Sequence, residues 1–148
     1  MTDSVFTIGY AQATPATLVA ALKAAGIERL IDVRGLPNSR RPGFSKRMLA
    51  AALGEAGIEY RHLGALGTPK AGREANRRGA MEVYRRILDA HLAEVPAQMA
   101  LIECGELARE KPSCLLCLEA DPAHCHRSVV AEHLAREHGL AIVHLHPE

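Results

Sequence analysis

The alternation of short apolar runs with helix signals in the first third of the chain constrains its fold more than any other feature. Residues 5–9 (VFTIG) and 29–33 (RLIDV) are apolar runs of strand length. Between them, Thr14-Pro15 is a typical helix start and Gly26 a typical helix stop. A strand–helix–strand order of this length predicts parallel pairing of the two strands through a right-handed crossover.

The rest of the chain continues this alternation. Helices are predicted at about 45–56, 81–92, 96–109 and 121–138, and strands at 58–63, 114–118 and 140–145. Residues 64–78 contain three glycines, a proline and four basic residues, which favours an irregular, mobile loop. About five strands alternating with helices indicate an α/β fold, a mainly parallel open sheet with helices on both faces. No domain boundary is evident, so residues 1–148 are expected to form a single domain.

The composition argues against several function classes. The 148 residues are 48% hydrophobic with a formal charge of +1, so no global charge attracts nucleic acid or a membrane. The start of the chain lacks the basic region and long apolar core of a secretory signal, and no stretch approaches the roughly 20 apolar residues of a membrane span. We therefore expect a cytoplasmic location and four reduced cysteines. Neither a Walker loop nor a G-x-G-x-x-G pattern occurs, which disfavours nucleoside triphosphatases and nicotinamide enzymes, and no particular cofactor is indicated.

The densest group of chemically active side chains lies in residues 113–134. An apolar run predicts a buried strand there, and Asp121-Pro122 predicts the start of the helix that follows. Cys125, His126 and Arg127 would then lie in the first two turns of that helix. Free backbone N–H groups and the helix dipole favour a thiolate or a bound anion at that position.

The two cysteines around this turn have different expected roles. Cys125 stands beside two histidines and an arginine, where the pKa of a thiol falls, so it is a candidate nucleophile or redox thiol; the alternative is a small buried side chain. Cys117, in the apolar strand, is expected to be structural unless the strand end exposes it. An oxidised state with a Cys117–Cys125 disulfide stays open, since the sequence does not reveal the distance between them.

A second informative site follows the strand at 29–33. From Arg34 to residue 47 there are five basic residues and no acid. Ligands of open parallel sheets collect at the carboxyl ends of the strands, so Tyr10, Asp32, Arg34 and Glu119 are expected to meet the helix start at one edge. Arg127 lies on the apolar stripe of its helix and therefore needs a partner there, either Asp32, Glu119 or a bound anion.

The basic residues have two interpretations. They could form a rim that binds a phosphate, or they could be a solvated surface paired with acids elsewhere. Aromatic residues are only 3% of the chain, which leaves few platforms for stacked bases and disfavours single-stranded nucleic acid. A small phosphorylated or nucleotide-like ligand fits better than a polymer. The residues of this rim are Arg34, Arg40, Arg41, Lys46, Arg47, Lys70, Arg73, Arg77 and Arg78.

The cysteines have two further interpretations, as metal ligands and as the nucleophile of a phosphatase or sulfurtransferase. Cys114 and Cys117 resemble a C-x2-C metal motif, but residues three apart on a regular strand point to opposite faces. A smaller metal-ligand set stays open: Cys117, Cys125 and one of His62, His124 or His126. Cysteine phosphatases and rhodanese-like sulfurtransferases place an arginine at C-x5-R, a spacing that this chain lacks although it contains the physical parts of an anion site.

Four separated motifs resemble those of the domain of unknown function 488 family of bacterial and archaeal proteins. They are TIGY, DVRGLPNSRRPGFSK, GIEYRHLGALG and LLCLEADPAHCHRSVVAEHL, in this order and over nearly the whole chain. The resemblance implies no particular activity. Family members often have a longer, more acidic segment after the LG turn, and Tyr-Met where this chain has Val83-Tyr84. The recurrent positions of the family match Gly9, Asp32, Val33, Arg34, Pro37, Ser39, Arg40, Phe44, Tyr60, Leu63, Cys117, Glu119, Pro122, Cys125, His126 and Arg127.

These observations lead to one functional hypothesis and two alternatives. We expect an enzyme with a cleft for a small phosphate- or nucleotide-like anion at the carboxyl edge of the sheet. The alternatives are a non-catalytic module that binds a nucleotide or nucleic acid, and a Cys/His metal-binding protein. The anion-binding candidates are Arg34, Arg40, Arg41, Arg127 and Tyr10, and the catalytic candidates are Cys125, Cys117, Glu119, His126 and Asp32.

Overall fold

The structure, a computed structural model, describes residues 2–147. These residues form five strands, six α-helices and two short 3-10 helices. The strands are β1 (Ser4–Gly9), β2 (Arg29–Asp32), β3 (Glu59–His62), β4 (Ser113–Cys117) and β5 (Ala141–Leu145). The helices are α1 (Pro15–Ala24), α2 (Lys46–Glu55), α3 (Lys70–Arg77), α4 (Met81–Leu92), α5 (Val95–Glu110) and α6 (His126–His138), with the 3-10 helices η1 (Gly64–Leu66) and η2 (Pro122–His124).

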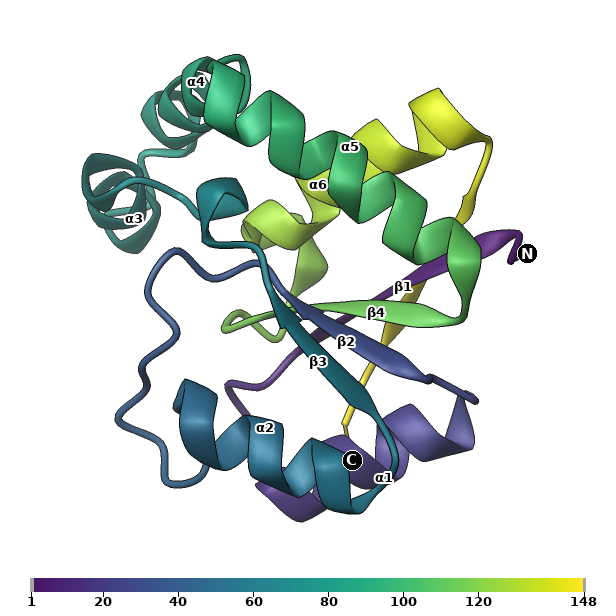
Figure 1. The fold of residues 1–148 in the computed structure, drawn as a ribbon. Helices are drawn as coiled ribbons and strands as arrows, with labels where there is room; N and C mark the ends of the chain where they lie inside the picture. The colour runs from purple at the N-terminus through teal and green to yellow at the C-terminus, as the bar shows by residue number, and fades with distance from the viewer. Residues whose placement is uncertain (1, 148) are drawn as a thin grey trace.

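The five strands form one parallel sheet in the order β3-β2-β4-β1-β5. The predicted α/β fold class, about five strands with helices on both faces, is confirmed. Figure 1 shows α1 and α2 below the sheet and α5 and α6 above it. Strand β4 lies between β1 and β2. The chain leaves β1 and β2 toward helices below the sheet and leaves β4 toward α6 above it, so neighbouring central strands send their connections to opposite faces. Such a divergence opens a crevice at the carboxyl ends of the strands.

Each face of the sheet has its own hydrophobic core. On one face, Leu18 and Leu22 of α1 and Leu49 and Leu53 of α2 pack below β1, β2 and β4. On the other, buried residues of α4, α5 and α6 cover the sheet. Burial of these apolar side chains positions the helices against the sheet, since apolar burial is the main stabilising contribution to such a fold. None of the helices in the described part of the chain is long and apolar enough to cross a membrane.

The prediction of an irregular loop at residues 64–78 is wrong. This segment contains η1 and the two-turn helix α3, which packs against α4. A Cβ at Gly72 would lie 2.6 Å from a methyl carbon of Thr68 and 3.3 Å from one of Ile87, so glycine allows the close approach of α3 to α4. Most residues of the helix are polar, its buried residues are Gly72 and Ala75, and packing against α4 stabilises it.

The predicted continuous helix from residue 121 to 138 is also wrong in its first turn. Asp121 caps the short η2 turn by accepting a hydrogen bond from the Ala123 backbone N–H at 2.9 Å. Cys125 then has extended backbone angles (φ −131°, ψ 141°) and is the N-cap residue of α6, which begins at His126. The break turns the Cys125 side chain toward the end of β4 and leaves the first N–H groups of α6 beside it.

Candidate functional site

A cavity of about 690 Å³ opens at the carboxyl edge of the sheet. Its floor holds Cys117 at the end of β4, and residues that follow β1 and β2 line one side. Residues of α3, α4 and the start of α6 line the other side. The cavity therefore occupies the crevice where the central strands send their connections to opposite faces, which is where ligands of open α/β sheets bind.

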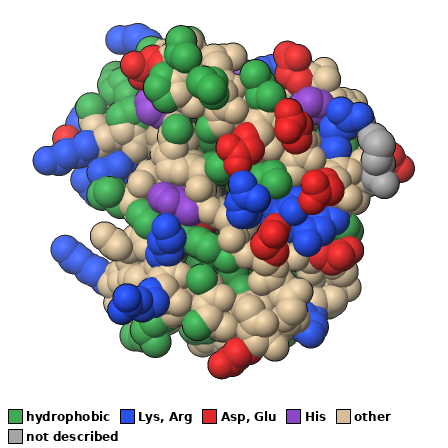
Figure 2. Space-filling view, in the orientation of Figure 1, with side chains coloured by type: hydrophobic (Ala, Val, Ile, Leu, Met, Phe, Trp, Pro, Cys, Tyr) green, Lys and Arg blue, Asp and Glu red, His purple; other side chains and the backbone are tan. Residues whose placement is uncertain are grey.

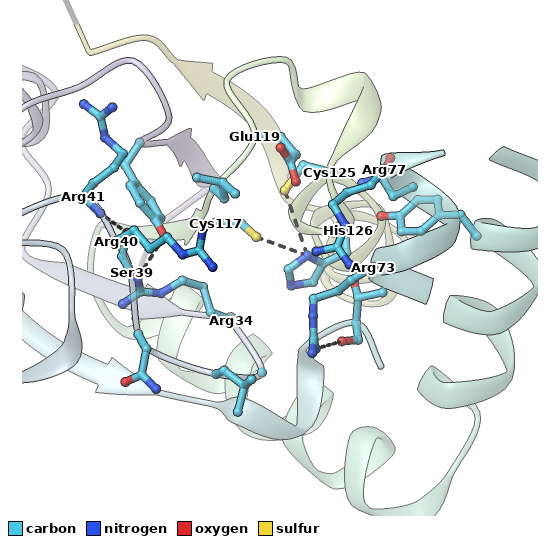
Figure 3. A pocket seen from close by; sticks show the side chains of 18 residues that line it. Arg34, Ser39, Arg40, Arg41, Arg73, Arg77, Cys117, Glu119, Cys125 and His126 are labelled. Atoms are coloured by element: carbon cyan, nitrogen blue, oxygen red, sulfur yellow. Dashed lines mark hydrogen bonds between the residues drawn. The ribbon is translucent and has the colours of Figure 1, made fainter. Parts of the chain in front are cut away.

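Cys117, Cys125 and His126 form a tight cluster in this cavity. Their sulfur and nitrogen atoms all lie within 4.8 Å of one another, and the side chains are 7%, 3% and 5% exposed. The Nδ1 atom of His126 lies 3.3 Å from the Cys117 sulfur and 4.0 Å from the Cys125 sulfur (Figure 3). Both cysteines are free thiols in this structure. The fold thus brings Cys117, at the end of β4, and Cys125, at the start of α6, into contact with one histidine although the cysteines are eight residues apart.

Hydrogen bonding determines the tautomer of His126. Its Nε2 atom lies 2.6 Å from the carbonyl oxygen of Val33, which can only accept, so Nε2 carries a proton. The Nδ1 atom is therefore the one that exchanges a proton with the sulfurs. A neutral imidazole accepts a thiol proton there, and an imidazolium donates to a thiolate. The histidine is thus fixed as the proton partner of the two cysteines.

The surroundings place the negative charge on Cys125. Burial opposes a thiolate, but hydrogen bonds from Cys117 and His126 and the charges of His126 and Arg127 hold the pKa of Cys125 well below its ordinary value. The pKa of Cys117 is raised, because a thiol that donates to the neighbouring thiolate and is buried resists ionisation. Burial also opposes charge on His126, yet the Cys125 thiolate and the Val33 carbonyl raise its pKa. These shifts favour a thiolate at Cys125 paired with a protonated His126, while Cys117 stays a thiol.

Arg127 lies beneath the cluster rather than in the cavity. The side chain is 0% exposed and is absent from the cavity lining. Its guanidinium donates to the Thr7 hydroxyl at 3.2 Å and to the backbone carbonyls of Glu119 and Ala120. Neither predicted carboxylate partner binds it. The guanidinium instead holds the β4–α6 connection, and its charge favours the Cys125 thiolate.

Asp32 is likewise buried outside the cavity. The carboxylate is 0% exposed and accepts hydrogen bonds from Arg34 (2.9 and 2.8 Å) and from the Tyr60 hydroxyl (2.6 Å). Burial opposes the charge of Arg34, but Asp32 raises the pKa of the guanidinium. Arg34 also donates to the Tyr10 hydroxyl at 3.2 Å and to the Phe44 carbonyl at 2.7 Å. Arg34 and Tyr10 therefore line the cavity as rigid, already paired groups.

Arginines form two opposite walls of the cavity. Arg40 and Arg41 come from the β2–α2 connection and Arg73 and Arg77 from α3, and Figure 3 shows the two pairs on either side of Cys117. In Figure 2, Lys and Arg side chains gather above and below an indentation at the left edge of the molecule. Among the residues that the structure describes, one carboxylate lines the cavity, that of Glu119, whose pKa is raised by burial and by the Cys125 charge. The cavity is thus strongly cationic above its sulfur floor.

The structure shows which of the other residues predicted from the sequence lie at the cavity. His126 joins the two cysteines, whereas His124 is exposed and His62 bonds the Arg34 carbonyl instead. Lys70 and Arg78 do not line the cavity. Tyr84 does, although its helical spacing with Leu88 and Leu92 marks it only as a core residue. No local pattern could have assigned Tyr84 to the site, because its place depends on how α4 packs.

The sequence matches a known protein family. The family model for the domain of unknown function DUF488 matches residues 14–134. The chain belongs to this family. The match includes both walls of the cavity and the Cys117–Cys125–His126 cluster of this DUF488 chain. No curated protein and no solved structure matches the chain.

Proposed function

We propose that this DUF488 protein is a thiol-dependent enzyme that acts on a small phosphate- or nucleotide-like anion. The observation that carries the proposal is the Cys117–Cys125–His126 cluster at the floor of an arginine-walled cavity. A lowered thiol pKa, as at Cys125, and a positioned imidazole are the requirements of an activated cysteine nucleophile. The free state of both cysteines fits the cytoplasmic location proposed from the sequence.

In the proposed reaction the Cys125 thiolate attacks the electrophilic atom of the bound substrate. A bond from sulfur to the substrate forms as the bond to the leaving group breaks, and the His126 imidazolium gives its Nδ1 proton to that group. Water then displaces the thiolate, and neutral His126 takes the proton that the water loses. Cys117 donates its S–H hydrogen bond to the thiolate in the resting enzyme, and half-buried Glu119 is a second proton carrier at the cavity wall.

Alkylation by iodoacetamide as a function of pH tests the activated thiolate. An ordinary thiol has a pKa of about 8.5, and its alkylation rate falls about tenfold for each pH unit below that value. Because the pKa of Cys125 is lowered, the proposal requires its thiolate to be present at neutral pH. Its rate is expected to stay constant between about pH 7 and pH 8 and to fall only when the pH drops through the lowered pKa.

The cysteine variants give the controls for this assay. Cys125→Ser is expected to abolish the reaction at neutral pH, whereas Cys104→Ser should leave it unchanged, because burial raises the pKa of Cys104 to about 12. Peptide mass spectrometry identifies the alkylated residue. If Cys117 and Cys125 react only as fast as an ordinary thiol, with the tenfold dependence on pH continuing to about pH 8, the proposal is refuted.

A metal site is the second candidate, favoured by the same three donor atoms. Two sulfurs and one imidazole nitrogen within 4.8 Å of one another could hold Zn²⁺ with a fourth position facing the cavity. The Val33 carbonyl would orient the histidine, as outer partners of metal-bound histidines do. Stoichiometric Zn²⁺ binding that survives dialysis and blocks alkylation of both cysteines would favour this function over the free thiolate. Weak binding, removed by dialysis, would exclude it.

A further inference from the structure

Two buried polar atoms in the described residues lack a hydrogen-bond partner: Arg41 Nε and the Tyr84 hydroxyl. Both residues line the cavity above Cys117. Leaving a buried donor unsatisfied is costly, and such groups are rare in folded proteins. Their coincidence in one cavity points to a bound molecule that supplies acceptors to both.

The two donors without a partner, Arg41 Nε and the Tyr84 hydroxyl, belong to different walls of the cavity. Arg41 lies beside Arg40 on the β2–α2 connection, and its own guanidinium is anchored by a hydrogen bond to the Ala13 carbonyl. Tyr84 projects from α4, next to α3 with Arg73 and Arg77. No ion pair of the described residues uses any of these four arginines. Arg40 and Arg41 therefore lie on one side of the sulfur floor and Arg73 and Arg77 on the other (Figure 3). Arg41 and Arg73 are each anchored through one guanidinium nitrogen to a backbone carbonyl, and no acid in the described part of the chain neutralises their charge.

We infer that the ligand of this cavity carries two separate anionic groups, one held by Arg40 and Arg41 and the other by Arg73, Arg77 and the Tyr84 hydroxyl. The inference rests on the proposed anion site and specifies its substrate class as a small bis-anion, with at least one phosphoryl group to match the arginine donors. The connecting part of the molecule lies over Cys117 and Cys125, which places the bond that reacts between the two anionic ends.

A single phosphate does not account for these observations. The cavity volume of about 690 Å³ is that of a site for a molecule much larger than one tetrahedral ion. A phosphate bound at one wall would leave the orphan donor of the other wall unsatisfied. Burial and the Cys125 charge raise the pKa of Tyr84, and nearby Thr68, which forms no hydrogen bond of ordinary geometry with it, lowers the pKa by less. The hydroxyl therefore remains a donor at neutral pH.

Calorimetric titration with α,ω-alkane bisphosphonates of increasing chain length tests the inference on the full chain. Methylphosphonate is the single-anion control. Two ends that bind at once give an affinity far above the statistical factor of about two, so one chain length should bind at least about tenfold tighter than methylphosphonate. If every bisphosphonate stays within about twofold of methylphosphonate, or if none binds, the two-anion inference is refuted.

Substitutions test which residues bind each anionic end of the ligand. Arg41→Gln and Arg77→Gln are each expected to weaken the best bisphosphonate about five- to tenfold, whereas Arg78→Gln, an exposed neighbour outside the cavity, should change nothing. Tyr84→Phe should weaken binding about threefold or more without lowering the melting temperature, because it removes a buried hydroxyl that has no partner. Equal effects of Arg77→Gln and Arg78→Gln, or a Tyr84→Phe protein that binds normally, would contradict the assignment.

The two proposals fail in distinguishable ways. Bisphosphonate binding is an equilibrium measurement that needs no reaction at Cys125, and alkylation at neutral pH needs no ligand. Tight bisphosphonate binding with ordinary thiols would keep the bis-anion site and refute the thiol enzyme. A reactive Cys125 with bisphosphonates bound no better than methylphosphonate would do the reverse.

Discussion

Replacing Arg127 separates its two roles, holding the β4–α6 connection and balancing the Cys125 thiolate. The side chain is fully buried and forms no ion pair with the described residues, and its guanidinium donates to the Thr7 hydroxyl and to two backbone carbonyls. Its charge favours the Cys125 thiolate. Arg127→Met removes both the charge and the hydrogen bonds at similar volume. Arg127→Lys retains the charge but cannot bridge two carbonyls and a hydroxyl at once.

The loss of stability follows from the groups left behind. In Arg127→Met the carbonyls of Glu119 and Ala120 lose their donor while they remain partly buried. Each buried acceptor without a partner costs about 1–3 kcal/mol, and removing a charge from the interior offsets a part, so we expect a net loss of about 2–4 kcal/mol. For a chain of this size that corresponds to a melting temperature lower by roughly 5–15 °C.

Two measurements on the same proteins check this reasoning. Urea unfolding followed by circular dichroism gives the free energy of unfolding, and the iodoacetamide profile gives the pH at which Cys125 loses its thiolate. Arg127→Met should shift that pH upward, since it removes a positive charge that favours the thiolate, and Arg127→Lys should leave it nearly unchanged while still losing about 1–2 kcal/mol. A Met variant as stable as the parent, or one with an unshifted profile, would refute this account.

The remaining predictions concern the strand ends beneath the cavity. Gly9→Ala would place a Cβ 1.8 Å from the Glu119 carbonyl oxygen and should lower the free energy of unfolding, measured in urea, by about 2–4 kcal/mol. The control Gly54→Ala lies in α2 with open space around it and should be neutral or stabilising. Equal stability of these two variants would contradict the close approach of β1 to the β4–α6 connection. Asp32→Asn breaks the buried ion pair with Arg34 and should lower the free energy of unfolding by about 3–5 kcal/mol. The control Asp89→Asn changes an exposed ion pair and should lower it by less than about 0.5 kcal/mol. A loss below about 1 kcal/mol at Asp32 would show that the fold does not need the buried pair.

The regular elements could be predicted because their signals are local. Thr14 accepts a hydrogen bond from the Thr17 N–H at the start of α1, Gly26 follows that helix with a positive φ of 73°, and apolar runs become the buried strands. Helix α3 escaped prediction because its glycine and polar residues are helical only against α4. The first turn of α6 escaped because Asp121 caps a 3-10 turn instead of the helix, and both outcomes satisfy the same local hydrogen-bonding rule.

The candidate site divides in the same way. The order of elements predicted one edge carrying Cys117, Cys125 and His126, since carboxyl ends of parallel strands meet there. Which histidine faces the sulfurs depended on side-chain packing, and so did the inward path of Arg127 to backbone carbonyls. Tyr84 entered the cavity from a helix whose spacing marks it only as apolar core.

The sequence by itself determined the α/β class, the parallel pairing of its strands and the kinds of side chain that reach the sheet edge, because these follow from periodicity, capping and the chirality of the chain. Only the tertiary structure decided which of those side chains meet. Hydrogen-bond partners, the sign of each pKa shift and the two arginine walls all depend on distances between residues far apart in the chain. Those distances are set by how α3 packs against α4 and how α4, α5 and α6 cover the sheet.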